Sequence, residues 1–155
     1  MSLLYFEDFP LGEIVQYGDI EVSAARIKAF AEQFDPQPFH IDEAAARATM
    51  TGGLIASGWH TAAMLMRVNY DNFLNRSTSQ GSPGIAEVNW FKPVRPGDRL
   101  SVRRTTVGAR PSASRPELGI VDFTFEVLNQ LGEVVMNQKN IILFTRRPAA
   151  EGTAP

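Results

Sequence analysis

The chain has 155 residues, a formal net charge of −2 at pH 7, a pI near 5.7 and no cysteine. This length predicts about one domain that can bury a sizeable core. The slight acidity argues against a nucleic-acid partner, which favours a basic patch, and the lack of cysteine excludes disulfides and thiolate chemistry. Because residues 1–8 do not resemble a signal peptide and no apolar stretch approaches the roughly 20 residues that span a bilayer, we expect a soluble, cytoplasmic protein without a membrane partner.

The first third of the chain predicts one strand and two helices. Residues 14–17 are apolar enough for a short strand. Ser23 is a favourable helix N-cap, and apolar residues then recur at near-helical spacing up to Phe34. A second short helix is predicted over residues 43–49, with Asp42 as its N-cap.

Between these two helices lies the segment Phe34-Asp35-Pro36-Gln37-Pro38-Phe39-His40, which holds an acid and one of only 2 histidines. A proline disfavours helical backbone in the residue before it, so Asp35 and Gln37 are expected to be extended or in a turn, and the segment to be non-helical. A carboxylate and an imidazole on such a stiff connector can share one water and act as an acid–base pair. The alternative is a proline-stiffened turn that merely exposes His40.

Residues 57–74 predict the helix that organises the fold. Its apolar residues recur at steps of three and four over most of its circumference, so we expect it to be buried. Ser57 is better suited to cap this helix than to act as a nucleophile. His60 is expected to be a packed, hydrogen-bonded histidine. No acid stands at a ligand-like spacing from His40 or His60, and no metal site is predicted.

The second half of the chain predicts antiparallel strands. After a loop over residues 76–83, the strands are expected at 85–91, 98–107, 120–128 and 133–144. In the third of them apolar and polar residues alternate, which is typical of a half-buried strand. One strand, several helices and four antiparallel strands indicate an α+β fold in which a curved sheet wraps around the long helix.

Three motifs occur in order along the chain. Asp35 to His40 reads Asp-Pro-Gln-Pro-Phe-His and is similar to an Asp-x-Asn-Pro-x-His signature, residues 53–61 resemble the opening of a central helix, and residues 94–98 resemble a turn between two strands. Together they resemble the MaoC-like (R)-specific enoyl-CoA hydratase and dehydratase family. The resemblance implies a single hotdog domain over residues 1–147 that forms a homodimer or a higher homo-oligomer. Residues 148–155 are expected to be a disordered tail, because they bury too little apolar area.

The resemblance also implies a hydro-lyase that adds water to a trans-2-enoyl-CoA thioester, or removes it from the (R)-3-hydroxyacyl thioester. No metal or redox cofactor is expected, and coenzyme A enters only as part of the substrate. Asp35 and His40 would hold the water, with Asp35 as the base. Gly58 would allow the thioester oxygen to approach the N–H groups that begin the long helix; the alternative is a glycine that serves only packing. Gln37 stands where the family usually has Asn, and the sequence leaves open how this changes the turn geometry.

Two other functions stay open at this point. A hotdog thioesterase places a carboxylate in or near the central helix, whereas this helix has no acid before Asp71. A non-catalytic module that only binds acyl thioesters would have no reason to hold both Asp35 and His40. Four arginines lie just before and within one predicted strand: Arg95, Arg99, Arg103 and Arg104. Their guanidinium groups could bind the phosphates of coenzyme A. A solvent-exposed face of the sheet explains these arginines equally well.

Overall fold

The computed structural model describes residues 2–150 of the chain. Its elements in chain order are η1 (Phe6–Asp8), β1 (Ile14–Glu21), α1 (Ala24–Phe34), α2 (Pro38–Ile41), α3 (Glu43–Arg47), α4 (Gly58–Asn72), η2 (Leu74–Arg76), β2 (Ser79–Gly81), β3 (Glu87–Trp90), β4 (Arg99–Pro111), β5 (Leu118–Leu128) and β6 (Val134–Thr145). This arrangement confirms the predicted α+β fold. None of the described helices is both long and apolar enough to cross a membrane.

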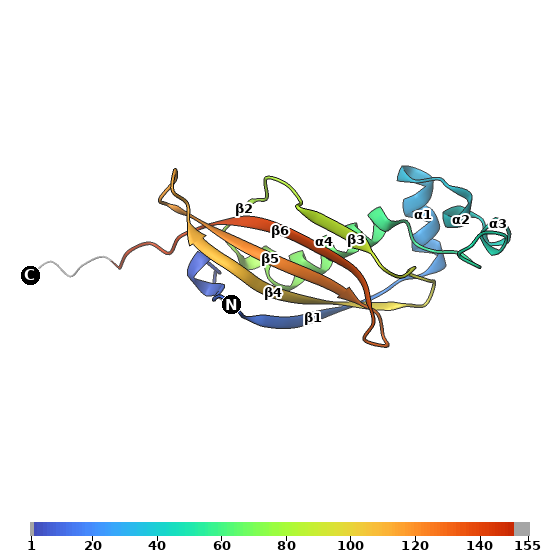
Figure 1. Cartoon of the computed structure of the whole chain (residues 1–155), viewed down its shortest axis with the longest axis horizontal. Coiled ribbons are helices and arrows are strands. Elements are labelled where there is room, and N and C mark those ends of the chain that lie inside the picture. The colour runs from blue at the N-terminus through green and yellow to red at the C-terminus, as the bar shows by residue number, and fades with distance from the viewer. Residues whose placement is uncertain (1, 151–155) are drawn as a thin grey trace, which may run out of the picture.

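The strands form one antiparallel sheet that lies along the central helix α4 (Figure 1). Its order is β1-β4-β5-β6-β2, and β3 also pairs with β6. Near one end of α4 lie the helices α1, α2 and α3, whereas the N-terminal segment lies at the opposite end of the molecule (Figure 1). The sequence between Phe34 and Gly58 is therefore gathered at one end of the sheet.

The core lies between the sheet and one side of α4. The apolar residues that alternate along β5 are buried, as predicted, and so are Met64, Leu65 and Val68 of the helix. At Gly18, where the pairing of β1 with β4 shifts register, φ is +89° and a Cβ would lie 2.4 Å from a methyl carbon of Val68. Only glycine allows strand and helix to approach so closely.

The expectation that α4 is buried over most of its girth was wrong. The sheet covers only one side of the helix, and on the other side Trp59, Met66 and Tyr70 are exposed. The buried positions include polar residues that the apolar pattern did not select, among them Thr61 and Asn69. Asn69 accepts a hydrogen bond from the Tyr17 hydroxyl at 2.7 Å, which satisfies a polar group inside the core.

Several predicted boundaries also need correction. The expected loop over 76–83 contains the end of η2 and the short strand β2, which pairs with β6. β4 continues to Pro111, because its last residues still pair with β5. The N-caps Ser23 and Asp42 are confirmed, since each side chain accepts a backbone hydrogen bond from the first turn of its helix.

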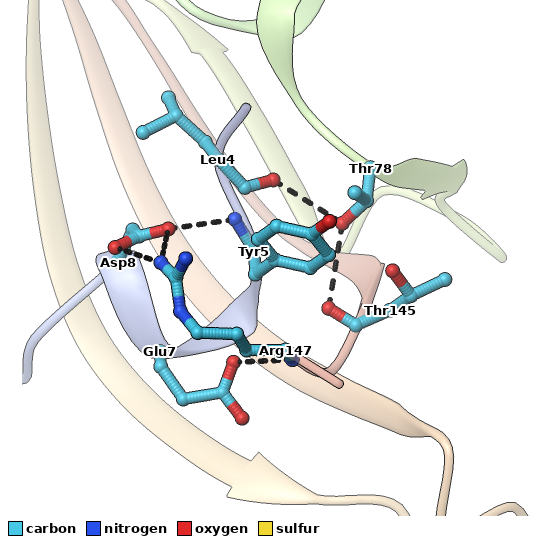
Figure 2. A network of polar contacts seen from close by, with 7 residues as sticks. All are labelled: Leu4, Tyr5, Glu7, Asp8, Thr78, Thr145 and Arg147. Carbon is cyan, nitrogen blue, oxygen red and sulfur yellow. Dashed lines mark hydrogen bonds and ion pairs between the residues drawn. The ribbon is translucent and has the colours of Figure 1, made fainter. Parts of the chain in front are cut away.

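The N-terminal segment is attached to the end of the last strand by a polar network (Figure 2). The Arg147 guanidinium donates to both carboxylate oxygens of Asp8 and lies 4.8 Å from the centre of the Tyr5 ring. Its backbone N–H donates to Glu7 at 2.8 Å, and Thr78 donates to the Leu4 carbonyl at 3.2 Å. Residues 148–150 follow without regular secondary structure, and residues 151–155 of the predicted tail lie outside the described residues.

Candidate active site

Asp35 stands where α1 ends. Its N–H completes the helix by donating to the Ala31 carbonyl at 2.8 Å, but its φ of −152° and ψ of 71° are not helical, as Pro36 requires. Gln37 is extended, as predicted. The expectation that the whole segment is non-helical was wrong, because Pro38 occupies the first position of α2, where the missing N–H of proline costs nothing. His40 therefore lies on a single helical turn.

The imidazole of His40 is buried, and each of its ring nitrogens lies near an oxygen atom. Nδ1 lies 2.7 Å from the Ile55 carbonyl oxygen, and Nε2 lies 3.3 Å from Oδ2 of Asp35. A carbonyl only accepts hydrogen bonds, so Nδ1 carries the proton. In the neutral ring, Nε2 then presents its lone pair beside the carboxylate. The two side chains that the sequence analysis selected are thus brought together.

Ser57 provides the shortest contact to Asp35. The completely buried hydroxyl donates to Oδ2 at 2.6 Å and accepts from the Trp59 N–H at 3.3 Å. Gln37 donates to the other carboxylate oxygen, Oδ1, at 2.8 Å. The pKa of Asp35 is lowered, first by the Ser57 hydrogen bond and then by Gln37 and the nearby His40, while partial burial opposes this change. Asp35 is therefore ionised at neutral pH.

The sequence analysis found the capping role of Ser57 but missed its contact with Asp35. The two residues are 22 positions apart, and no spacing rule connects the end of one helix with the start of another. The bond between His40 and the Ile55 carbonyl was missed for the same reason. Gln37, noted only as a departure from the family pattern, is long enough to fold back onto Asp35.

Gly58 is the first residue of α4, and its N–H has no hydrogen-bond acceptor within residues 2–150. Its carbonyl accepts from the Trp90 indole N–H at 2.9 Å. A Cβ at this position would lie 2.6 Å from Trp90 Cε2, so packing also requires glycine here. The role of Gly58 in admitting an oxyanion stays a prediction. The close packing of Trp90 is a second reason for glycine at this position.

These residues open onto one cavity of about 500 Å³. Asp35, His40, Ser57 and Gly58 lie together in its wall. The other polar residues of the wall are Gln37, Thr51, Thr61, Lys92 and Arg95, and the rest is apolar, contributed by Phe39, Met50, Ile55, Ala56, Trp59, Trp90, Phe91, Pro93 and Val94. A mostly apolar cavity with a few convergent polar groups is typical of a small-molecule site. It can hold an apolar chain and present one polar group to Asp35 and His40.

His60 does not belong to the cavity wall. Its ring stacks on Phe30 with centroids 4.7 Å apart and planes 8° from parallel. Burial lowers its pKa, and the positive charge of Arg26 acts in the same direction. The histidine is packed, as predicted, but the predicted hydrogen bond is absent at Nδ1, which has no partner among the described residues.

A curved antiparallel sheet on a long central helix defines a hotdog-fold protein, and a solved structural neighbour is described by the same fold. The model of the MaoC like domain matches residues 8–123. The chain belongs to the MaoC-like dehydratase family, as the three motifs indicated.

Individual relatives agree with this assignment. A MaoC-like dehydratase from Rhodospirillum rubrum with a crystal structure has 45% sequence identity to this chain. The two structures superimpose with a TM-score of 0.83, and the match covers 94% of this chain and 99% of that chain. An (R)-hydratase from A. caviae is 20% identical and shares the fold, with a TM-score of 0.70 over 92% of this chain and 99% of that one. A mesaconyl-CoA hydratase from Cereibacter sphaeroides is 36% identical over 73 residues, which are 46% of this chain and 21% of the relative.

Proposed function

We propose that the protein is a hydratase or dehydratase that adds water to a trans-2-enoyl-CoA thioester to give the (R)-3-hydroxyacyl thioester, or runs the reverse reaction. The observation that carries this proposal is the contact between His40 Nε2 and Asp35 Oδ2, at 3.3 Å, in the wall of a mostly apolar cavity. Family membership and the mesaconyl-CoA hydratase relative support the reaction type and the CoA thioester.

In the proposed reaction, a water molecule binds between the ionised carboxylate of Asp35 and Nε2 of His40. As its oxygen bonds to the β carbon of the substrate, one water proton passes to Asp35. The Asp35–His40 pair then delivers a proton to the α carbon on the same face, so the elements of water add without a further reactant. Ser57 and Gln37 act as positioning residues, because they hold the carboxylate at both oxygens.

Negative charge grows on the thioester oxygen during this reaction and needs a donor. The Gly58 N–H at the start of the 15-residue helix α4 is the proposed one, because the helix N-terminus favours negative charge. The interaction would strengthen as the charge develops, which is what lowers a barrier rather than only binding the substrate.

The geometry gives a hotdog thioesterase no comparable support. The one acid in α4 is Asp71, next to its last residue, where it is exposed and accepts from Arg67 at 2.9 Å. This carboxylate does not belong to the cavity wall. A non-catalytic binding module, in turn, leaves the paired Asp35 and His40 without a use.

Assays of the purified protein on matched enoyl-CoA and acyl-CoA thioesters test the proposal. We expect hydration of the enoyl thioesters, an (R) product on chiral chromatography and little thioester hydrolysis. Asp35→Asn and His40→Ala should each lower hydration by at least about 10²-fold. Asp71→Asn is the control and should leave the rate unchanged.

Unfolding temperatures measured for the same variants separate lost chemistry from lost folding. Near-normal turnover in a folded Asp35→Asn or His40→Ala protein would contradict the assignment. Release of free coenzyme A from saturated acyl-CoA, abolished by Asp71→Asn, would instead establish the thioesterase.

A further inference from the structure

Arg95 is the one cationic side chain of the cavity wall that is not neutralised by a carboxylate within the described residues. The ionisable residues of that wall are Asp35, His40, Lys92 and Arg95. Asp35 and His40 contact each other, and Lys92 pairs with Glu133. Arg95 forms no ion pair with any described Asp or Glu; its Nη2 donates to the Thr51 carbonyl at 2.5 Å.

The other arginines of this region are already engaged, so they do not compete for the role. Their carboxylate partners lie at 2.8 to 2.9 Å and belong to the protein itself: Arg99 binds Asp19, Arg103 binds Glu126, and the buried Arg104 binds Glu13. None of these three side chains contributes to the wall of the cavity. Of the four arginines noted in the sequence, Arg95 is therefore the one that lies in the cavity wall and has no carboxylate partner within the described residues.

The fold holds Arg95 in place. Its backbone N–H donates to the Asp98 carboxylate at 2.9 Å, and the Asp98 N–H donates back to the Arg95 carbonyl at 3.1 Å, within a turn in which Gly97 has a φ of +90°. A Cβ on Gly53 would lie 3.3 Å from Nη1, so the glycine leaves room for the guanidinium. One hydrogen bond to Thr51 fixes the fork while other N–H groups stay available.

We infer that Arg95 binds a phosphate of the carrier to which the acyl thioester is attached. The inference rests on the proposed function, in which the thioester lies at Asp35 and His40. The carrier part of the substrate then extends from the thioester toward the opening of the cavity. Arg95 is exposed, so it lies on the solvent side, where a carrier rather than an acyl chain emerges. A guanidinium fork matches phosphate oxygens in geometry and charge.

Comparison of two thioesters of the same enoyl group tests this inference. One is the CoA thioester, and the other is the pantetheine thioester, which has no phosphate. Arg95→Ala should raise KM for the CoA thioester by about two- to fivefold, the upper part of the range for an exposed charged contact, with kcat essentially unchanged. KM for the pantetheine thioester should not change.

Arg110→Ala is the matched control. Arg110 is also exposed and forms no ion pair within the described residues, and it stands near the far end of β4, which has 13 residues. At about 3.3 Å per residue it is roughly 35 Å from the start of that strand. This variant should keep the wild-type KM for both thioesters, which excludes a general effect of lost positive charge.

The outcomes separate this inference from the proposed function. Equal weakening of both thioesters by Arg95→Ala would overturn the inference, because Arg95 would then only shape the cavity. An effect confined to substrates with a carboxylate on the acyl group would also overturn it. If the wild type hydrates neither thioester, the proposed function fails; calorimetry with coenzyme A and pantetheine alone still decides whether Arg95 distinguishes them.

Discussion

Replacing Ser57 with glycine removes the hydroxyl that holds the Asp35 carboxylate. That hydroxyl donates at 2.6 Å and is fully buried in the folded protein. A hydrogen bond to a charged group contributes about 1.5–3 kcal/mol. If this stabilisation applies to the ionised, correctly placed carboxylate, its loss lowers kcat/KM by about 10- to 150-fold. Glycine is preferred to alanine because it costs a helix N-cap only a few tenths of a kcal/mol.

The same variant should change the pH dependence in a defined direction. The folded protein lowers the pKa of Asp35, and the Ser57 hydrogen bond is the largest cause. The stability gained from this bond is present above the unfolded-state pKa and is lost as the pH falls through the folded one. Without Ser57, Asp35 takes up its proton at a higher pH. The acidic limb of kcat/KM for enoyl-CoA hydration should therefore move to higher pH.

Ser23→Gly is the control for the capping role, because Ser23 caps α1 with a side chain that accepts from Arg26 at 3.1 Å and does not belong to the cavity wall. It should show a similar small change in unfolding temperature and an unchanged pH profile. A Ser57→Gly protein with an unmoved acidic limb and kcat/KM within twofold of wild type would refute the positioning role.

Two further predictions concern Gly58 and association. Gly58→Ala should lower kcat more than it changes KM, because the N–H would no longer stabilise the charge on the thioester oxygen. The new Cβ would also clash with Trp90, and the double variant Gly58→Ala/Trp90→Ala removes this clash. Recovery of kcat in the double variant would show that Gly58 serves only packing. Sedimentation at micromolar concentration should give a species of at least twice the 17.1 kDa chain mass. Met66 lies on the exposed apolar side of α4, so Met66→Lys should weaken this association if that side is covered by the partner. Leu131→Lys, in the turn between β5 and β6, is the control and should not weaken it. A wild-type protein that stays monomeric would contradict the prediction.

Features encoded by neighbouring residues were predicted well. Ser23 and Asp42 cap their helices because a side-chain oxygen beside free N–H groups needs no tertiary support. The alternation along β5 depends only on the two faces of a strand. The proximity of Asp35 and His40 was also a local inference, since prolines constrain the backbone between them.

Features that depend on distant contacts were not predicted. The pattern of α4 is apolar on two sides, but periodicity does not say which side meets the sheet, and the side with Met66 and Tyr70 stayed exposed. β2 is too short to be recognised, because its three residues are ordered through pairing with β6. α2 consists of one turn that starts at Pro38, and it was missed because the two prolines led to the expectation that the whole segment is non-helical.

The polar part of the site combines these two kinds of information. Asp35 and His40 come from one short segment, so a motif detects them, but each is oriented by an atom from residues 55–57: the Ser57 hydroxyl for the carboxylate and the Ile55 carbonyl for the imidazole. The backbone between the two sets is connected directly, because Ile55 donates its N–H to the Phe39 carbonyl at 3.3 Å. A change that loosens this connection should therefore affect both the protonation of Asp35 and the proton position on His40, even though it touches neither side chain.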